Sequence, residues 1–125
     1  IRMIEPTTSY KVMEIMESEK PFMVFFKSEF CDYCVMLSTV LGVLDKKYSP
    51  YLDFYTLDVN DEQSAADVFE DYVEGVPSVI LFHNGQFVVV PEPEEPDPIM
   101  WYRLSYLEEF INQFFRSDDE TGTNL

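Results

Sequence analysis

Residues 23–34, MVFFKSEFCDYC, join a continuous apolar run to the only two cysteines of the 125-residue chain. The apolar run occupies residues 21–27, has the length of one strand and is bounded by polar residues, which is typical of a buried central strand. From Cys31 to Tyr48 apolar residues recur at three- and four-residue spacing, and Pro50 prevents continuation, which predicts a helix. Cys31 is therefore expected at the start of a helix that directly follows a buried strand.

This placement gives the cysteine pair the properties of a redox dithiol. Unpaired backbone N–H groups and the positive end of the helix macrodipole stabilise a thiolate, so we expect Cys31 to be the nucleophile. Cys34 lies one helical turn further along, from where it can attack a mixed disulfide on Cys31 and release the partner in reduced form. Cys31 and Cys34 are the candidate catalytic residues.

Two other interpretations of the cysteine pair stay open at this point. A closed zinc site needs about four ligands, whereas the chain offers no third cysteine and a single histidine, His83, in a predicted turn. A structural disulfide is the second alternative, although so short a loop gains little stability from chain entropy. The ligand count leads us to expect no metal site.

The rest of the chain predicts an alternating pattern of strands and helices. Asn84-Gly85, between two β-rich runs, is a strong hairpin signal, and the spacing of apolar residues indicates the other elements. The expected elements beyond those above are an edge strand at 2–5, a helix from about Thr8 to Glu19, a strand at 51–59, a helix at 61–73 with Ala66, Phe69 and Val73 on one face, two hairpin strands, and an amphipathic helix carrying Leu104, Leu107, Ile111 and Phe114. We expect one domain over residues 1–116 and a disordered acidic tail over 117–125.

The charge of the chain limits its partners. Twenty-four acidic against eight basic residues give a formal net charge of −16, which repels nucleic-acid phosphates and anionic lipid surfaces. We therefore expect neither nucleic acid nor membrane as a partner, and no apolar run approaches the roughly 20 residues of a membrane span. A cytoplasmic monomer is the expectation. The alternative is a mature form whose export signal has been removed, because the chain begins with Ile1.

Three stretches together resemble the thioredoxin superfamily, and the resemblance covers residues 2–116. They are MVFFKSEFCDYC at 23–34, TLDVND at 56–61 and GVPSVILFHNGQ at 75–86, with Gly-Val-Pro about forty residues after the cysteines. The resemblance implies an α/β thioredoxin fold, a central mixed sheet flanked by helices. It also implies a thiol–disulfide oxidoreductase that acts on protein disulfides, takes electrons from a reductase or partner dithiol, and needs no bound cofactor.

The resemblance also assigns roles to residues around the dithiol. Pro77 is implied to be the cis proline that packs against the dithiol, and the backbone of Val76 to pair with an extended substrate chain. Phe30, Asp32 and Tyr33, which surround the cysteines, are the other residues expected to contact substrate. From the residues alone, Pro77 could equally be a proline that only marks the start of a strand, with no role in the site.

The sequence departs from the family pattern behind the dithiol. The buried Asp that serves as a proton relay falls at Phe25, and its Lys partner falls at Thr56. Cys34 must then lose its proton to water or to a nearer carboxylate, Glu29 or Asp32, so turnover near neutral pH should be slower. These departures keep a second hypothesis open, a non-catalytic binding module with an acidic docking surface.

Lys27 takes the place of a family tryptophan four residues before Cys31. If its ammonium reached the sulfur it would lower the pKa of Cys31, whereas the carboxylate of Asp32 would raise it. Since the two effects oppose, the sequence does not give the sign of the net shift. The glutathione-binding features of glutaredoxins, Thr before the cis proline and a later Gly-Gly pair, are absent, so we do not expect glutathione binding.

An acidic, proline-rich insertion, Pro91–Pro98, precedes the last helix. If Asn84-Gly85 forms a two-residue turn, Pro77 faces Glu92, which puts the insertion near the dithiol. We hypothesise a rim that selects basic substrates, with Trp101 packed over the groove. Its acidic residues are Glu92, Glu94, Glu95 and Asp97. The alternative is a solvated loop in which Trp101 anchors the last helix into the core.

Overall fold

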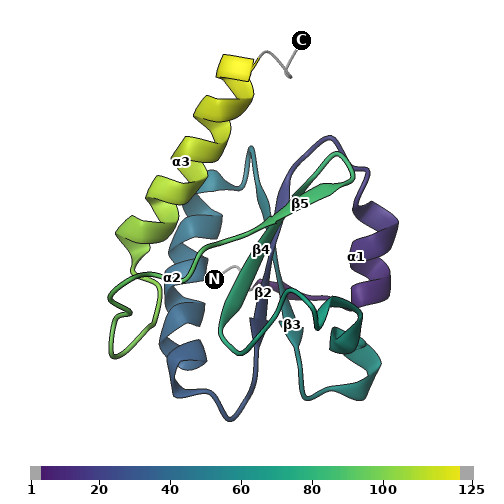
Figure 1. Cartoon of the computed structure of the whole chain (residues 1–125), viewed down its shortest axis with the longest axis vertical. Helices are drawn as coiled ribbons and strands as arrows, with labels where there is room; N and C mark the ends of the chain where they lie inside the picture. Colours follow the sequence, from purple (N-terminus) through teal and green to yellow (C-terminus); the bar gives the residue numbers. More distant parts are fainter. Residues whose placement is uncertain (1–3, 122–125) are drawn as a thin grey trace.

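The structure, a computed structural model, describes residues 4–121, with side chains as far as Ser117. Its centre is a five-stranded mixed sheet in the order β1-β3-β2-β4-β5 (Figure 1). The strands are β1 Glu5–Pro6, β2 Phe22–Lys27, β3 Asp53–Asp58, β4 Ser78–His83 and β5 Gln86–Val89. β1 and β2 run parallel to β3, whereas β4 runs antiparallel to both β2 and β5. The expected thioredoxin-type sheet is confirmed.

Helices cover both faces of this sheet. They are α1 Ser9–Ile15, α2 Asp32–Tyr48 and α3 Leu104–Thr121, with the short 3₁₀ helices η1 Glu62–Ser64 and η2 Ala66–Phe69. α2 and α3 lie on one face, and α1 lies with the 3₁₀ segments on the other (Figure 1). Among these described helices, none is both long and apolar enough to cross a membrane.

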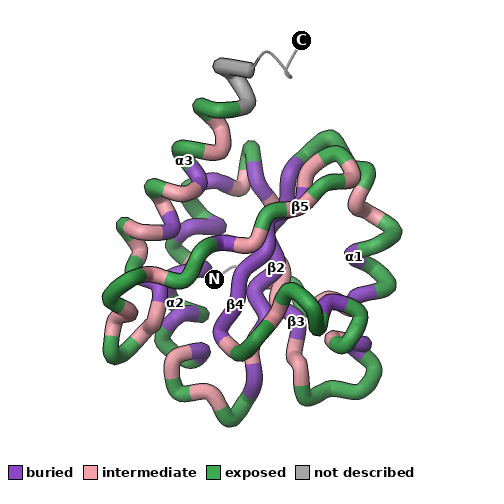
Figure 2. Tube along the Cα trace, viewed as in Figure 1, coloured by how far each residue is buried: buried purple, intermediate pink, exposed green. Residues whose placement is uncertain are grey.

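The central strand β2 shows why its sequence is a continuous apolar run. Met23 and Phe25 point into the core under α2 and α3, whereas Phe22, Val24 and Phe26 point into the core under α1 and η2. Because both faces are covered, the usual alternation of apolar and polar residues disappears. Figure 2 shows the buried trace concentrated along β2 and β4, with exposed residues at the periphery.

The hairpin between β4 and β5 has the expected turn and register. Asn84 and Gly85 have φ angles of 53° and 78°, the left-handed geometry of a type I′ turn. His83 pairs with Gln86, and the Val90 N–H donates to the Val79 carbonyl at 2.9 Å. The chain therefore leaves β5 beside the start of β4, as the hairpin register predicted.

The hairpin turn also explains why α1 ends earlier than expected. The prediction of a helix as far as Glu19 is wrong, because α1 ends at Ile15. The Met16 carbonyl accepts the Gly85 N–H of the hairpin turn at 2.7 Å. It therefore bonds to the turn instead of to an N–H of a further helical turn. A Cβ on Gly85 would lie 2.7 Å from Oε1 of Glu17, at the end of a flexible side chain that can move, so the positive φ is the main reason for glycine here.

The predicted helix at 61–73 is wrong, because two 3₁₀ helices take its place. Ala65 between them has φ 54° and ψ 43°, a left-handed conformation that interrupts any helix. The Ser64 hydroxyl lies 2.7 Å from the carbonyls of Asp58 and Asp61, which favours a compact turn after β3. The predicted apolar face is still present, since Phe69 is buried under the sheet.

Both ends of the chain differ slightly from the predicted boundaries. The first strand begins at Glu5, and residues 2 and 3 of the predicted edge strand lie outside the described residues. α3 continues to Thr121, so residues 117–121, predicted to begin a tail, have helical backbone. Residues 122–125 lie outside the described residues.

Candidate functional site

The dithiol lies where β2 passes into α2. Cys31 is the N-cap of α2, with an extended backbone at φ −102° and ψ 110°. Its Sγ accepts the Cys34 N–H at 3.2 Å. An N–H of the first helical turn that points at the sulfur stabilises negative charge there. The predicted position at the helix start is therefore confirmed.

The two cysteines form a disulfide, and their environments differ. The Cα atoms of Cys31 and Cys34 are 5.3 Å apart. Cys34 is 3% exposed and belongs to the core under α2, whereas Cys31 is half-buried. A partner can therefore reach Cys31 more easily than Cys34.

The Val76-Pro77 peptide bond is cis, as the family resemblance implied. Pro77 is buried and directly precedes β4. The next residue, Ser78, pairs with Phe26 near the end of β2, and β2 leads to Cys31. The topology thus brings the cis proline and the dithiol to the same end of the sheet.

The other predicted substrate contacts lie on the surface around the cysteines. Phe30 is 79% exposed, and Asp32 and Glu29 are exposed as well. Tyr33 is half-buried, and its ring packs edge-on against Trp101 with centroids 5.1 Å apart. The exposed ring of Phe30 therefore presents a large apolar surface directly before Cys31 in the chain.

Phe25 and Thr56 occupy the positions expected to hold the proton relay. They are paired in register on neighbouring strands. Phe25 is buried in the same core cluster as Cys34. An aromatic ring thus lies behind the dithiol where the resemblance implied a carboxylate.

Lys27 is half-buried and lines a groove beside α2 together with Ser38 and Thr56. Within residues 4–117 its ammonium makes no hydrogen bond to Cys31. The hypothesis that Lys27 tunes the sulfur therefore receives no support from a direct contact.

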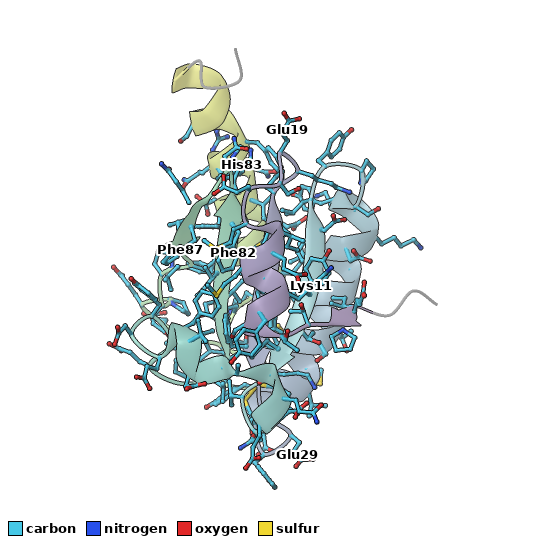
Figure 3. The ribbon with its side chains drawn as sticks, turned by 90° about the vertical axis from the view of Figure 1, so that its right-hand side faces the viewer. Lys11, Glu19, Glu29, Phe82, His83 and Phe87 are labelled. Atoms are coloured by element: carbon cyan, nitrogen blue, oxygen red, sulfur yellow. A yellow bond between two sulfur atoms is a disulfide. The ribbon has the colours of Figure 1, made fainter. Side chains whose placement is uncertain are left out.

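His83, the single histidine of the sequence, lies away from the cysteine segment. Figure 3 shows His83 at one end of the molecule and Glu29, two residues from Cys31, at the other. In the described part of the chain, no three His, Cys, Asp or Glu side chains come close enough to hold a metal ion.

The loop before α3 reaches the dithiol through Trp101. The indole Nε1 of Trp101 donates to the Glu92 carboxylate at 2.6 Å, while the ring contacts Tyr33. Trp101 has φ 65°, which is unusual for a bulky residue. Paired backbone hydrogen bonds with Asp97, both 3.0 Å, hold it there.

Asp97 organises the same loop. Its Oδ1 accepts the N–H groups of Ile99 and Met100 at 2.8 and 3.1 Å, and its Oδ2 accepts Arg103 Nε at 3.1 Å. The two backbone hydrogen bonds, followed by that of Arg103, lower the pKa of Asp97. Asp97 is therefore a structural carboxylate rather than a free charge of a rim.

Tyr102 anchors the start of α3 in the core, and Trp101 packs against the same cluster. Tyr102 is 1% exposed and lies in the cluster under α2 and α3, and burial raises its pKa. Trp101, next to it, stays half-buried at the dithiol. The alternative in which Trp101 helps to anchor the last helix therefore agrees with the structure, and the same ring contacts Tyr33.

Two residues beside the dithiol, Ser28 and Asn60, were not predicted from the sequence. The Ser28 hydroxyl donates to Asn60 Oδ1 and accepts the Phe30 N–H at 3.1 Å. A serine just before Cys31 and an asparagine just after a strand were both available as signals. Nothing in the sequence pairs them across 32 positions.

The fold and this site define a thioredoxin-fold protein with a Cys-x-x-Cys dithiol and a cis proline at the same end of the sheet. The family model described as thioredoxin matches residues 4–98, and the chain belongs to the thioredoxin family. The match ends inside the loop before α3, so the residues around Trp101 lie beyond it. Family and cysteine pair together support thiol–disulfide oxidoreductase chemistry.

Individual relatives agree with this assignment. The chain is 29% identical to a thioredoxin-like protein of Synechocystis over 109 residues, which cover 87% of this chain and 98% of that one. It is 31% identical to the chloroplastic M-type thioredoxin of Spinacia oleracea over 72 residues, 58% of this chain but only 39% of the spinach protein. Mitochondrial thioredoxin 3 of Saccharomyces cerevisiae, in oxidised form, shares the fold with a TM-score of 0.66 at 20% identity, covering 89% of this chain and 94% of its own.

Proposed function

We propose that the protein exchanges disulfides with protein substrates, with Cys31 as the nucleophile and Cys34 as the resolving residue. The observation that carries the proposal is the asymmetry of the pair. Cys31 is accessible at a helix N-cap, whereas its disulfide partner Cys34 is buried. Attack on the substrate therefore begins at Cys31, and the buried Cys34 then resolves the mixed disulfide between Cys31 and the substrate.

In the direction of reduction, the Cys31 thiolate attacks one sulfur of a substrate disulfide. A Cys31–substrate disulfide forms, and the other substrate sulfur leaves as a thiolate. Cys34, after losing its proton, then attacks Cys31 Sγ, which releases the second substrate thiolate and leaves the Cys31–Cys34 disulfide. Two electrons have passed to the substrate, and a reductase or partner dithiol must return them.

The resolving step meets an aromatic ring, that of Phe25, at the position where the resemblance implied a carboxylate. Since Phe25 lies behind Cys34, the proton of Cys34 leaves to water or through the exposed carboxylates of Glu29 and Asp32. We propose that this step limits turnover near neutral pH. We propose a cytoplasmic location because a reducing compartment suits this direction of transfer, and a monomer because a net charge of −16 makes copies of the chain repel one another.

For the substrate chain, we propose that it lies extended against the backbone of Val76-Pro77 and contacts Phe30, Asp32 and Tyr33. Support comes from the topology, which brings Pro77 and Cys31 to one end of the sheet. The exposed ring of Phe30 offers apolar area at the edge of this site.

An insulin reduction assay driven by dithiothreitol tests the proposal. We expect the wild-type protein to accelerate precipitation of the insulin B chain, and Cys31→Ser to give the rate of dithiothreitol alone. If the wild type also gave only that background rate, reduction of protein disulfides would be contradicted. The non-catalytic binding module would then be favoured.

For substrate choice, we propose that the loop Pro91–Pro98 favours basic substrates. Support comes from the Trp101–Tyr33 contact, which brings the loop to the dithiol. The free charges of this rim are Glu94 and Glu95, which are exposed, because Glu92 and Asp97 hold the loop together.

The double variant Glu94→Gln/Glu95→Gln tests the rim without breaking the loop. We expect kcat/KM to fall about two- to tenfold for a disulfide peptide rich in Lys, and to stay level or rise for one rich in Glu. The difference should shrink in 0.5 M salt, where exposed charges are screened. An equal change for both peptides would contradict the proposal that the loop selects basic substrates.

A further inference from the structure

Hydrogen bonds of one buried residue, Ser28, hold the four-residue segment 28–31 between β2 and α2. The Cys31 N–H donates to the Ser28 carbonyl at 3.1 Å, and the Phe30 N–H donates to the Ser28 hydroxyl at 3.1 Å. The hydrogen of that hydroxyl goes to Oδ1 of Asn60. Ser28 is buried, so water does not compete freely for these hydrogen bonds.

Asn60 is itself fixed, in the turn that follows β3. Its N–H donates to Asp58 Oδ1 at 2.9 Å. The Val59 N–H donates to the Lys27 carbonyl at 2.9 Å, and the Asp61 N–H donates to the Asp58 carbonyl at 3.2 Å. The acceptor of the Ser28 hydroxyl therefore belongs to a turn that is held by its own hydrogen bonds. Through the Ser28–Asn60 bond, this turn restrains the residues before Cys31.

We propose that Ser28 and Asn60 are positioning residues that hold Cys31 at the N-cap of α2. The inference rests on the proposed function, in which Cys31 reacts as a thiolate. Stabilisation by a helix N-terminus falls off within the first turn, and the Cys34 N–H must point at the Cys31 sulfur, as it does at 3.2 Å. Without the Ser28–Asn60 bond the segment loosens and the sulfur leaves this geometry for part of the time.

The competing explanation is that this bond contributes to folding alone. In that case its loss would lower the melting temperature but leave the reactivity of Cys31 in the folded protein unchanged. The rate at which iodoacetamide alkylates Cys31 in the reduced protein separates the two, because this rate follows the thiolate fraction and needs no substrate. Peptide mapping assigns the label to Cys31.

The experiment compares Ser28→Ala, Asn60→Ala and the double variant, with melting temperatures measured in parallel. Each single variant should slow alkylation at pH 7 by about three- to tenfold, the range of one hydrogen bond. The double variant should be no slower than the slower single, since both act through one bond. Ser28→Thr, which keeps the hydroxyl, should restore the wild-type rate, and Ser18→Ala, an exposed serine by the hairpin turn, is the matched control.

The reduction potential of the Cys31/Cys34 couple gives a second measurement. Loss of thiolate stabilisation favours the disulfide, so the potential should become more negative, by up to about 30 mV for a tenfold change. Unchanged alkylation and potential in both single variants would overturn the proposal, and so would multiplicative effects in the double variant. Because neither readout uses a substrate, a failed insulin assay would contradict the proposed function and leave this result standing.

Discussion

The segment that carries the cysteines and the loop before α3 meet at the Tyr33–Trp101 contact, but they are held in place differently. The cysteine segment, 28–34, lies between the central strand and a helix that is packed on the sheet. The loop, 91–101, depends on its own hydrogen bonds at Asp97 and Glu92. The fold itself thus positions the cysteines, whereas a few side-chain hydrogen bonds position the loop surface beside them. Substitutions can therefore alter the loop without altering the cysteine segment.

The largest expected effect lies at Tyr102, where the loop joins the core. Tyr102→Ala should lower the free energy of unfolding by about 3–5 kcal/mol, as for other large aromatic residues removed from a core. Urea denaturation checks this, and Tyr51→Ala, at a tyrosine that is 64% exposed, should cost less than about 0.5 kcal/mol. A loss below about 1 kcal/mol for Tyr102→Ala would mean that the loop and α3 are not anchored there.

The next effect is a pH dependence confined to the loop. The pKa of Asp97 is lowered in the folded protein by the Ile99 and Met100 N–H groups and by Arg103. Its stabilisation is therefore present above the unfolded pKa of about 3.9 and is lost as the pH falls through the lower folded value. Trp101, the only tryptophan, should keep constant emission from pH 7 to about 4 and change only below that.

Two variants check this assignment. Asp97→Ala should show at pH 7 the emission that the wild type reaches only in acid, whereas Glu95→Ala should follow the wild-type curve. A wild-type transition centred above pH 5 would contradict the role given to Asp97, and so would an unchanged curve for Asp97→Ala.

The smallest expected effect is at Glu92, which accepts the Trp101 indole N–H. Because this pair lies at the surface, Glu92→Ala should change the free energy of unfolding by less than about 1 kcal/mol. The Trp101 emission should nevertheless shift, since the indole N–H loses its acceptor. Glu92→Gln keeps an acceptor and should stay closer to the wild type. If Glu92→Ala left the emission unchanged, packing of the ring against Tyr33 and the core would by itself hold Trp101.

Much of the fold and the centre of the site could be predicted from the sequence because their signals are local. An apolar run followed by Cys31 and a helical pattern, and an Asn-Gly turn, each imply structure within a few residues. The hairpin register then followed from the turn alone, and it correctly brought Glu92 towards the active-site end of the sheet.

The errors arose where distant residues decide local conformation. α1 ends early because the Met16 carbonyl serves the hairpin turn almost seventy positions later. The segment after β3 is not a regular helix because Ala65 adopts a left-handed backbone, although its side chain gives no hint of this. Ser28 and Trp101 acquire their partners only when the sheet is formed, so no local pattern could have paired them.

The ring of Phe25 behind Cys34 has a consequence for how this protein could be engineered. A buried carboxylate is costly to fold around, and an aromatic ring in its place strengthens packing while it removes a proton acceptor from the reaction. Under the proposed function, the ring of Phe25 therefore favours stability at the expense of a fast resolving step at neutral pH. Phe25→Asp is expected to reverse both effects, with a lower free energy of unfolding and a faster resolving step.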